Sequence, residues 1–313
     1  MSTQVLTSKH HDMGRNPGPH SRESRLQRFA NGVVPHALIA PGLLLVLIVM
    51  LYPTFHGVVL SFFDTNTFTR VTSFVGFGQY IQLFRSPEFL NALTQTFVLV
   101  AGTVIIGIVT SIINALVLHH VSRGGRIWRT IVLIPWLISG IAVATIWRAL
   151  FQPTGGYSTA VVMALGLNPV TWFASPFWSM SIIILASVWA ISPFSMLIIY
   201  SGLQMVNPDM YEAAAIDGAN ALQRFAYITA PSVAPQFSLA MVFLSVGAVN
   251  SFEIIMLMTG GGPGRSTEVL AILLYRLGFD QLDFHAAAAC MVLLLAINLM
   301  LSVFYLKLHS TKG

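Results

Sequence analysis

The chain has 313 residues, 55% of them hydrophobic and only 9% charged, with a formal net charge of +5 at pH 7. Soluble domains carry about a quarter charged residues, so these charges are too few to cover a water-facing surface of this size. The composition excludes an ordinary soluble protein and predicts a chain whose main solvent is lipid.

The N-terminal segment, residues 1–33, is polar and contains Pro17, Pro19 and several histidines. This composition predicts a disordered tail, which we expect to lie in the cytoplasm. His10 and His11 are adjacent, but scattered histidines in a polar tail are more typical of a tail than of a metal site. No role is assigned to this segment.

Six largely apolar windows, with Glu253 as their one charged residue, follow within residues 34–310. Each reaches the roughly 18 to 20 residues that a helix needs to cross the bilayer core. The windows are residues 42–63, 97–118, 130–147, 178–203, 237–259 and 286–306. We therefore predict an all-α polytopic membrane protein with six transmembrane helices.

The basic residues are distributed unequally between the two sides of this predicted topology. Most of the 16 Lys and Arg residues fall on the side of the N-terminus, among them Arg22, Arg123, Arg126 and Arg224. This asymmetry is the one that the positive-inside rule expects. It predicts a cytoplasmic N-terminus and C-terminus, and it accounts for the positive charge without a nucleic-acid partner.

Three prolines, Pro53, Pro135 and Pro193, lie inside these windows. Proline removes a backbone hydrogen bond and kinks a helix. Kinks suit a protein that moves, and simple packing explains them equally well. Ser192 and Ser195 flank Pro193, and we expect their hydroxyls to satisfy the carbonyl that this proline frees.

The connection at residues 204–235 is the longest on the predicted cytoplasmic side. Asn207 followed by Pro208 predicts a helix start, and Ala213–Ala215 favour helix continuation. Gly218 then predicts a break, and Asn220 a second helix start. Small alanine side chains on a short exposed helix allow another backbone to approach, which favours a docking surface. An amphipathic connector on the membrane surface remains the alternative.

One carboxylate, Glu253, lies inside the windows. A charged group at membrane depth is costly and usually faces a cavity, a partner or a proton path. With Asn250 and Ser251 it is a candidate for the substrate path, because such groups bind hydroxyls. Trp136 and Trp189 are candidate platforms for stacking on a sugar ring. A structural ion pair or hydrogen bond between helices is the alternative for Glu253.

Residues 259–267 have the sequence TGGGPGRST, which invites comparison with a phosphate-binding loop. A Walker A loop needs G-x-x-x-x-G-K-[ST] between a strand and a helix. Here Thr259 takes the place of the first glycine, Arg265 that of the lysine, and a membrane span precedes. We therefore expect no ATP site, no cofactor and no metal on this chain. With one cysteine, Cys290, and no paired acids in the windows, catalysis is not expected either.

Several motifs together resemble one family. Glu212-Ala213-Ala214, followed by Asp217-Gly218-Ala219 and by two prolines at 231 and 235, is similar to the EAA motif of ABC-importer permeases. Ala230 departs from the leucine that often precedes the first proline. The stretches FVGF at 74–77, WRALF at 147–151 and TGGGP at 259–263 accompany the motif in order. From about residue 41 to 308 the chain resembles the carbohydrate-uptake class of binding-protein-dependent permeases.

This resemblance implies a pore of two permease subunits above two copies of an ATP-hydrolysing subunit, which bind ATP and Mg²⁺. It also implies an extracytoplasmic solute-binding protein, a carbohydrate substrate and a bacterial inner membrane. We favour a second, related permease as partner over a second copy of this chain. The ATPase-coupling residues would be Glu212, Ala213, Ala214, Asp217 and Gly218. The alternative function is a secondary transporter driven by an ion gradient, which would need Glu253 or His56 as its coupling group.

Overall fold

The computed structural model describes residues 39–65, 71–121, 124–168 and 170–310. It divides the chain into two units, residues 1–56 and 57–313, which are described separately. The predicted tail at residues 1–33 lies outside the described residues, and its boundary with the predicted permease domain at residue 34 stays a prediction.

The first described helix runs from Ile39 to Leu60 and passes from the first unit into the second. It includes a π-helical turn, η1 (Leu47–Leu51), followed by α2 (Tyr52–Leu60). Pro53 lacks an amide hydrogen, and the π-helical turn that precedes it accommodates this loss. The predicted window at 42–63 was too long at its end, because Phe63 is in a strand.

A small hairpin and a short helix begin the second unit. β1 (Phe63–Thr65) and β2 (Thr72–Phe74) pair antiparallel, and α3 (Gly78–Arg85) follows. α4 (Pro87–His120) has 34 residues and starts well before the predicted window at residue 97. Its first turns are polar, so a search for apolar windows missed them, although Ser86 caps the helix by accepting from the amide of Phe89 at 3.3 Å.

The predicted third span, residues 130–147, is wrong as a single helix. The structure has two helices, α5 (Gly125–Leu137) and α6 (Gly140–Leu150), which meet at 97°. Pro135 weakens the end of α5, and Ser139 starts α6 as its N-cap, accepting from the amide of Ala142 at 3.4 Å. α7 (Tyr157–Ala164) and the short η2 (Trp172–Ala174) follow.

α8 (Pro176–Leu203) matches the predicted window at 178–203 and continues through Pro193. The hydroxyl of Ser111 on α4 donates to the carbonyl of Ser192 at 3.0 Å, which joins the two helices beside the proline. Ser195 does not satisfy a freed carbonyl, because its hydroxyl has no hydrogen-bond partner in the described part of the chain.

After α8 the chain turns through a series of short helices. They are α9 (Pro208–Ile216), α10 (Ala221–Arg224), η3 (Phe225–Thr229) and α11 (Ala230–Ser232). α12 (Ala234–Val249) and α13 (Phe252–Met258) then replace the single helix predicted for 237–259. The break falls at Asn250–Ser251, where the hydroxyl of Ser251 donates to the carbonyl of Ala248 and so competes with the helical backbone.

The last elements are α14 (Leu270–Tyr275), η4 (Arg276–Asp280) and α15 (Phe284–Ser310). Residues 260–285 lie between the last two predicted windows, yet part of this segment enters the core: Leu270 and Ile272 are fully buried. The amide of Leu270 donates to the hydroxyl of Thr96 on α4 at 2.9 Å. Long-range packing of this kind leaves no mark in a hydropathy pattern.

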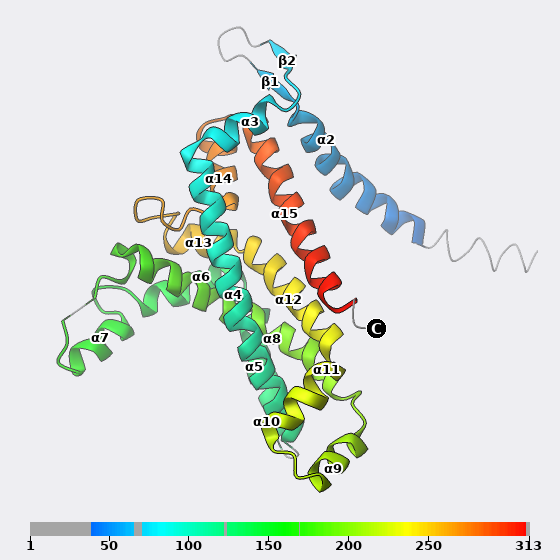
Figure 1. Ribbon diagram of the computed structural model, residues 1–313. Helices are drawn as coiled ribbons and strands as arrows, with labels where there is room; N and C mark the ends of the chain where they lie inside the picture. The colour runs from blue at the N-terminus through cyan, green and yellow to red at the C-terminus, as the bar shows by residue number, and fades with distance from the viewer. Residues whose placement is uncertain (1–38, 66–70, 122–123, 169, 311–313) are drawn as a thin grey trace, which may run out of the picture. The chain divides into compact units, whose positions relative to one another are not determined.

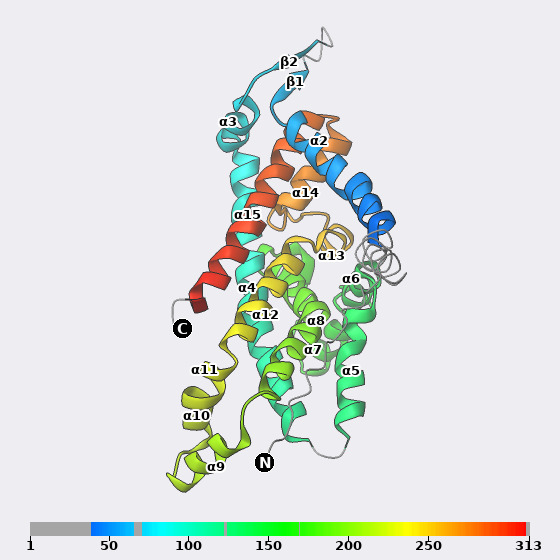
Figure 2. The ribbon, with the colours of Figure 1, turned by 90° about the vertical axis from the view of Figure 1, so that its right-hand side faces the viewer.

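The core of the second unit lies where α4, α8 and α12 pack together (Figures 1 and 2). Leu99, Ile183 and Leu244 are completely buried there. Gly107 allows this packing, since a Cβ at that position would lie 2.7 Å from the side chain of Leu244.

Four of the described helices are long and apolar enough to cross a membrane. Two bent pairs raise the number to as many as six if each pair is one span. One pair is α5 with α6, and the other joins residues 221–232 to α12 at 76°.

Candidate functional site

The loop at residues 204–235 contains a helix that starts and stops as its sequence predicts. Asn207 is the N-cap of α9 and accepts from the amide of Asp209 at 3.0 Å. Pro208 occupies the first turn, where its missing amide hydrogen costs nothing. Asp209 lies beside the positive end of the helix dipole.

Gly218 ends α9 in a Schellman motif. Its amide bonds to the carbonyl of Ala215 at 3.2 Å, and the amide of Ala219 bonds to the carbonyl of Ala214 at 2.9 Å. The motif requires a left-handed residue after the C-cap, and Gly218 has φ of +77°. No atom lies within 4 Å of the position that a Cβ would take there. Within this chain, the glycine therefore serves backbone conformation and not close packing.

The second half of the loop is held by two local devices. Asn220 and Gln223 form a reciprocal capping box at the start of α10, with bonds of 2.9 and 2.8 Å. The hydroxyl of Tyr211 on α9 bonds to the hydroxyl of Thr229 on η3 at 2.9 Å. These bonds fold the loop back on itself, so that α9 lies at its far end (Figures 1 and 2).

The predicted coupling residues lie together on α9 and in the turn that follows. Glu212, Ala213, Asp217 and Gly218 are exposed, and Ala214 is half-buried. The carboxylates of Glu212 and Asp217 make no side-chain hydrogen bond or ion pair within the described residues. The large apolar side chain of Ile216, next to them, is 87% exposed. Met205 and Leu222 in the same loop are also 80% and 76% exposed, and exposed apolar groups rimmed by polar residues mark interaction sites.

The two broken spans meet at their breaks. The carboxylate of Glu253, in the first turn of α13, lies where a Cβ of Gly140 would be, at the first turn of α6. At the other end of these helices, Arg148 donates to the carbonyl of Leu257 at 2.8 Å. α6 and α13 therefore run side by side in the same direction away from the breaks.

Three of the five predicted substrate-path residues have exposed side chains at or near these breaks. Asn250 and Glu253 are exposed at one break. Trp136 lies just before the other, is 40% exposed and stacks on Phe194 at 4.8 Å between ring centroids. Ser251 differs, since it is buried and its hydroxyl donates to the carbonyl of Ala248 at the end of α12.

Trp189 also differs from the other substrate-path candidates. It is half-buried and packs edge-on against Trp147 at 6.2 Å. The indole ring of Trp189 packs between α8 and α6, so less of its surface is available to contact a ligand.

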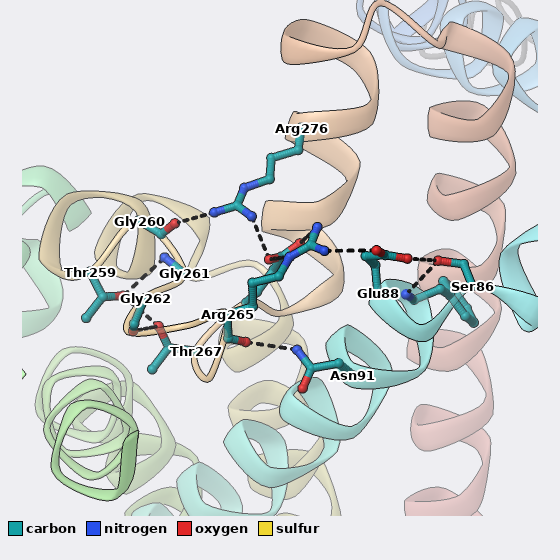
Figure 3. A network of polar contacts seen from close by, with 12 residues as sticks. Ser86, Glu88, Asn91, Thr259, Gly260, Gly261, Gly262, Arg265, Thr267 and Arg276 are labelled. Atoms are coloured by element: carbon teal, nitrogen blue, oxygen red, sulfur yellow. Dashed lines mark hydrogen bonds and ion pairs between the residues drawn. The ribbon is translucent and has the colours of Figure 1, made fainter. Parts of the chain in front are cut away.

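Sequence reasoning missed a buried ionic network around Glu268, whose side chain is completely buried. Its carboxylate accepts from Nε of Arg265 at 2.7 Å and from Nη1 of Arg276 at 2.7 Å. Arg276 also donates to the carbonyl of Gly260 at 3.0 Å, and Arg265 pairs with Glu88 at 3.2 Å (Figure 3). The signal was available in the pairing of Arg265 with Glu268, three residues apart in an otherwise uncharged loop.

This network fastens the glycine-rich segment at 259–267 to the start of α4. Asn91 on α4 donates to the carbonyl of Arg265 at 2.8 Å, and the hydroxyl of Thr267 donates to the carbonyl of Gly262 at 2.7 Å (Figure 3). Hydrogen bonding to Glu268 raises the pKa of Arg265. The preceding element is the helix α13, so this segment lacks the strand that a Walker A loop needs.

Comparison with known proteins identifies the family. The chain belongs to the family described as binding-protein-dependent transport system inner membrane component, whose sequence profile matches residues 104–310. It is 31% identical to the trehalose/maltose transport system permease protein of Thermococcus litoralis over 283 residues, covering 90% of this chain and 95% of that protein. It is 30% identical to the sn-glycerol-3-phosphate transport system permease protein of Yersinia pestis, covering 91% and 96%.

The solved structures agree. A chain of a bacterial ABC transporter involved in the import of alginate has a TM-score of 0.77 and 25% identity, covering 92% of this chain and 99% of that one. The predicted fold class, an all-α polytopic permease of the ABC-importer type, is thereby confirmed. The alternative of a secondary transporter is not supported by these relatives.

Proposed function

We propose that this chain forms part of the translocation path for a sugar or related polyol, including a polyol phosphate, and that residues 204–235 couple this path to a separate ATPase. The observation that carries the proposal is the exposed helix α9, whose carboxylates have no partner within the described residues and which is tied to η3 by the bond between Tyr211 and Thr229. This helix lies on a chain of the binding-protein-dependent permease family. Two relatives are named as permease proteins of a trehalose/maltose and of an sn-glycerol-3-phosphate transport system. These names support a sugar or polyol phosphate as the substrate.

Each coupling residue has a physical role in this proposal. Glu212 and Asp217 supply charge to contacts with the ATPase, because they are free of partners within the described chain. Ala213 and Ala214 allow a groove of the ATPase to approach the helix closely. Gly218 holds the turn after α9, so that the helix leaves the loop at a defined angle.

The substrate path is proposed to pass the two helix breaks. Irregular backbone at membrane depth is tolerated where it lines a cavity or is buried in protein, and broken helices are typical of transporter binding sites. Asn250 and Glu253 would hydrogen-bond substrate hydroxyls, and Trp136 would stack on a ring face. Ser251 and Trp189 would support this site through the packing described above.

The partners follow from the same proposal. They are a second, homologous permease subunit, two copies of the ATP-hydrolysing subunit, which bind ATP and Mg²⁺, and an extracytoplasmic solute-binding protein. A related solved structure is described as an alginate ABC transporter in complex with a periplasmic protein bound to an alginate pentasaccharide, which supports the binding protein. Both termini would lie in the cytoplasm of a bacterial cell, with lipid around the spans and no nucleic-acid partner.

Gentle purification of the tagged chain from its own membranes tests the proposal, with the stoichiometry of co-purifying proteins as the readout. We expect a second permease and two copies of an ATPase. Uptake by the same cells should stop when ATP is depleted while the ion gradient is maintained. Recovery of this chain alone, with uptake that follows the ion gradient, would overturn the proposal and return attention to Glu253 and His56.

A further inference from the structure

A hollow of about 720 Å³ opens between the end of α4 and the residues 204–235. Its apolar walls come from Leu116 on α4, Leu203 on α8, and Leu222 and Phe225 on α10 and η3. Its polar lining includes one arginine, Arg224, and two histidines, His119 and His120, whose ring N–H groups can donate to a phosphate. Apolar walls with a few convergent polar groups are the usual character of a ligand pocket.

A second hollow, of about 460 Å³, lies at the same end of α4. Arg126 and Arg129 line it, and Arg129 lies over the ring of Tyr200 at 5.3 Å from the centroid. None of the described residues that line either hollow is acidic. Arg224 forms no ion pair with the described residues, so its charge is available to a ligand.

The surroundings of these hollows match the boundary between lipid and water. Leu222 is 76% exposed and Tyr227 is 79% exposed beside the first hollow. Tyrosine is enriched at membrane interfaces, where its ring meets lipid and its hydroxyl meets water. Basic pockets between membrane helices on the cytoplasmic side are suited to anionic lipid head groups.

We propose that the 720 Å³ hollow binds one anionic phospholipid of the cytoplasmic leaflet, with its phosphate at Arg224, His119 and His120. One acyl chain lies along Leu116 and Phe225. The apolar walls distinguish this ligand from a free phosphate, which would leave them empty. The placement in the cytoplasmic leaflet rests on the proposed function, since it takes residues 204–235 to face the cytoplasm.

A lipid in this hollow would touch both the end of α4 and the segment that follows the predicted coupling helix. Tyr211, which ties α9 to η3, also lines the hollow. The bound head group would therefore stabilise the folded-back form of residues 204–235. This would make coupling depend on the lipid composition of the membrane.

The test uses the full complex with its co-purifying subunits, in nanodiscs of phosphatidylcholine mixed with phosphatidylglycerol. Native mass spectrometry counts the lipids that stay bound to the complex after it is released from the nanodisc. We expect phosphatidylglycerol to be retained by the wild type, and Arg224→Gln to weaken its retention about fivefold, the value of one basic contact near a lipid surface. Arg85→Gln is the matched control, because it removes the same charge from an exposed position at the end of α3, next to the opposite end of α4.

Equal retention of phosphatidylglycerol by Arg224→Gln and wild type would overturn the lipid site. Equal retention of phosphatidylcholine and phosphatidylglycerol by the wild type would do the same. Photocrosslinking from benzoylphenylalanine in place of Leu222 gives a second readout that does not depend on the arginine variant. A phosphatidylglycerol adduct supports the proposal, whereas adducts with the ATPase alone would assign the hollow to that partner. ATP-driven uptake measured in parallel separates the two proposals. If uptake persists in a variant that has lost the lipid, the dependence of coupling on the lipid falls. If no ATPase co-purifies, the proposed function falls, and the lipid count still decides whether the hollow binds the lipid.

Discussion

Gly218 offers a direct test of the coupling loop, because the structure separates backbone conformation from packing at this position. With φ of +77°, most residues that have a Cβ would be destabilised by about 1–2 kcal/mol in this left-handed conformation. No atom lies within 4 Å of the added Cβ, so no steric clash within the chain adds to this. Asparagine visits the left-handed region routinely, and a β-branched residue there is an outlier.

The expected order of coupled activity is therefore Gly218→Asn close to wild type, Gly218→Ala lower and Gly218→Val lowest. A cost of 1–2 kcal/mol reduces the population of the native turn roughly 5- to 30-fold. The assay is substrate-dependent ATP hydrolysis and uptake by the purified complex in proteoliposomes, with the amount of inserted chain as control. Wild-type uptake by Gly218→Val would refute the role of the turn. If Gly218→Asn were as inactive as Gly218→Val, the glycine would instead be needed for close approach of the partner.

Three further predictions follow from the site. Glu268→Gln should lower stability in detergent by about 1–3 kcal/mol, because it removes the buried counter-charge of Arg265 and Arg276, whose own side chains are 37% and 29% exposed and keep part of their hydration; an unchanged thermal unfolding midpoint would contradict this. Gly140→Ala should displace the carboxylate of Glu253 and reduce uptake, and uptake by Glu253→Ala should be insensitive to adding Gly140→Ala; strictly additive losses in the double variant would sink the idea. Trp189→Ala should lower the free energy of unfolding by about 2 kcal/mol, less than in a full core because the ring is half-buried, whereas Trp136→Ala should reduce uptake with little change in unfolding, which the same two assays distinguish.

The sequence predicted the class of protein and the local structure of the loop. Long apolar windows reveal membrane helices because hydropathy is a property of consecutive residues, and α8 was found almost to the residue. The cap at Asn207, the turn at Gly218 and the second start at Asn220 were likewise predicted correctly. Caps and left-handed turns depend on a few neighbouring residues, which a sequence displays in full.

The helix breaks were harder to predict. Pro135 and Ser139 indicated that residues 130–147 were irregular, but not that the two halves meet at 97°. The residue types at Asn250–Ser251 do not by themselves mark a break, because Ser111 and Asn114 lie inside the unbroken helix α4. The direction of a broken helix is decided by what it packs against, here α6 against α13.

The sequence by itself determined that this chain is a helical membrane permease with a capped, exposed helix between two spans. Only the tertiary structure decided that Glu253 lies against Gly140, that Trp189 packs on Trp147, and that Glu268 is buried between two arginines. The physical reason is the range of the interactions. Hydropathy, caps and turns are set by residues near in sequence, whereas burial and ion pairing depend on segments that meet only after the chain has folded.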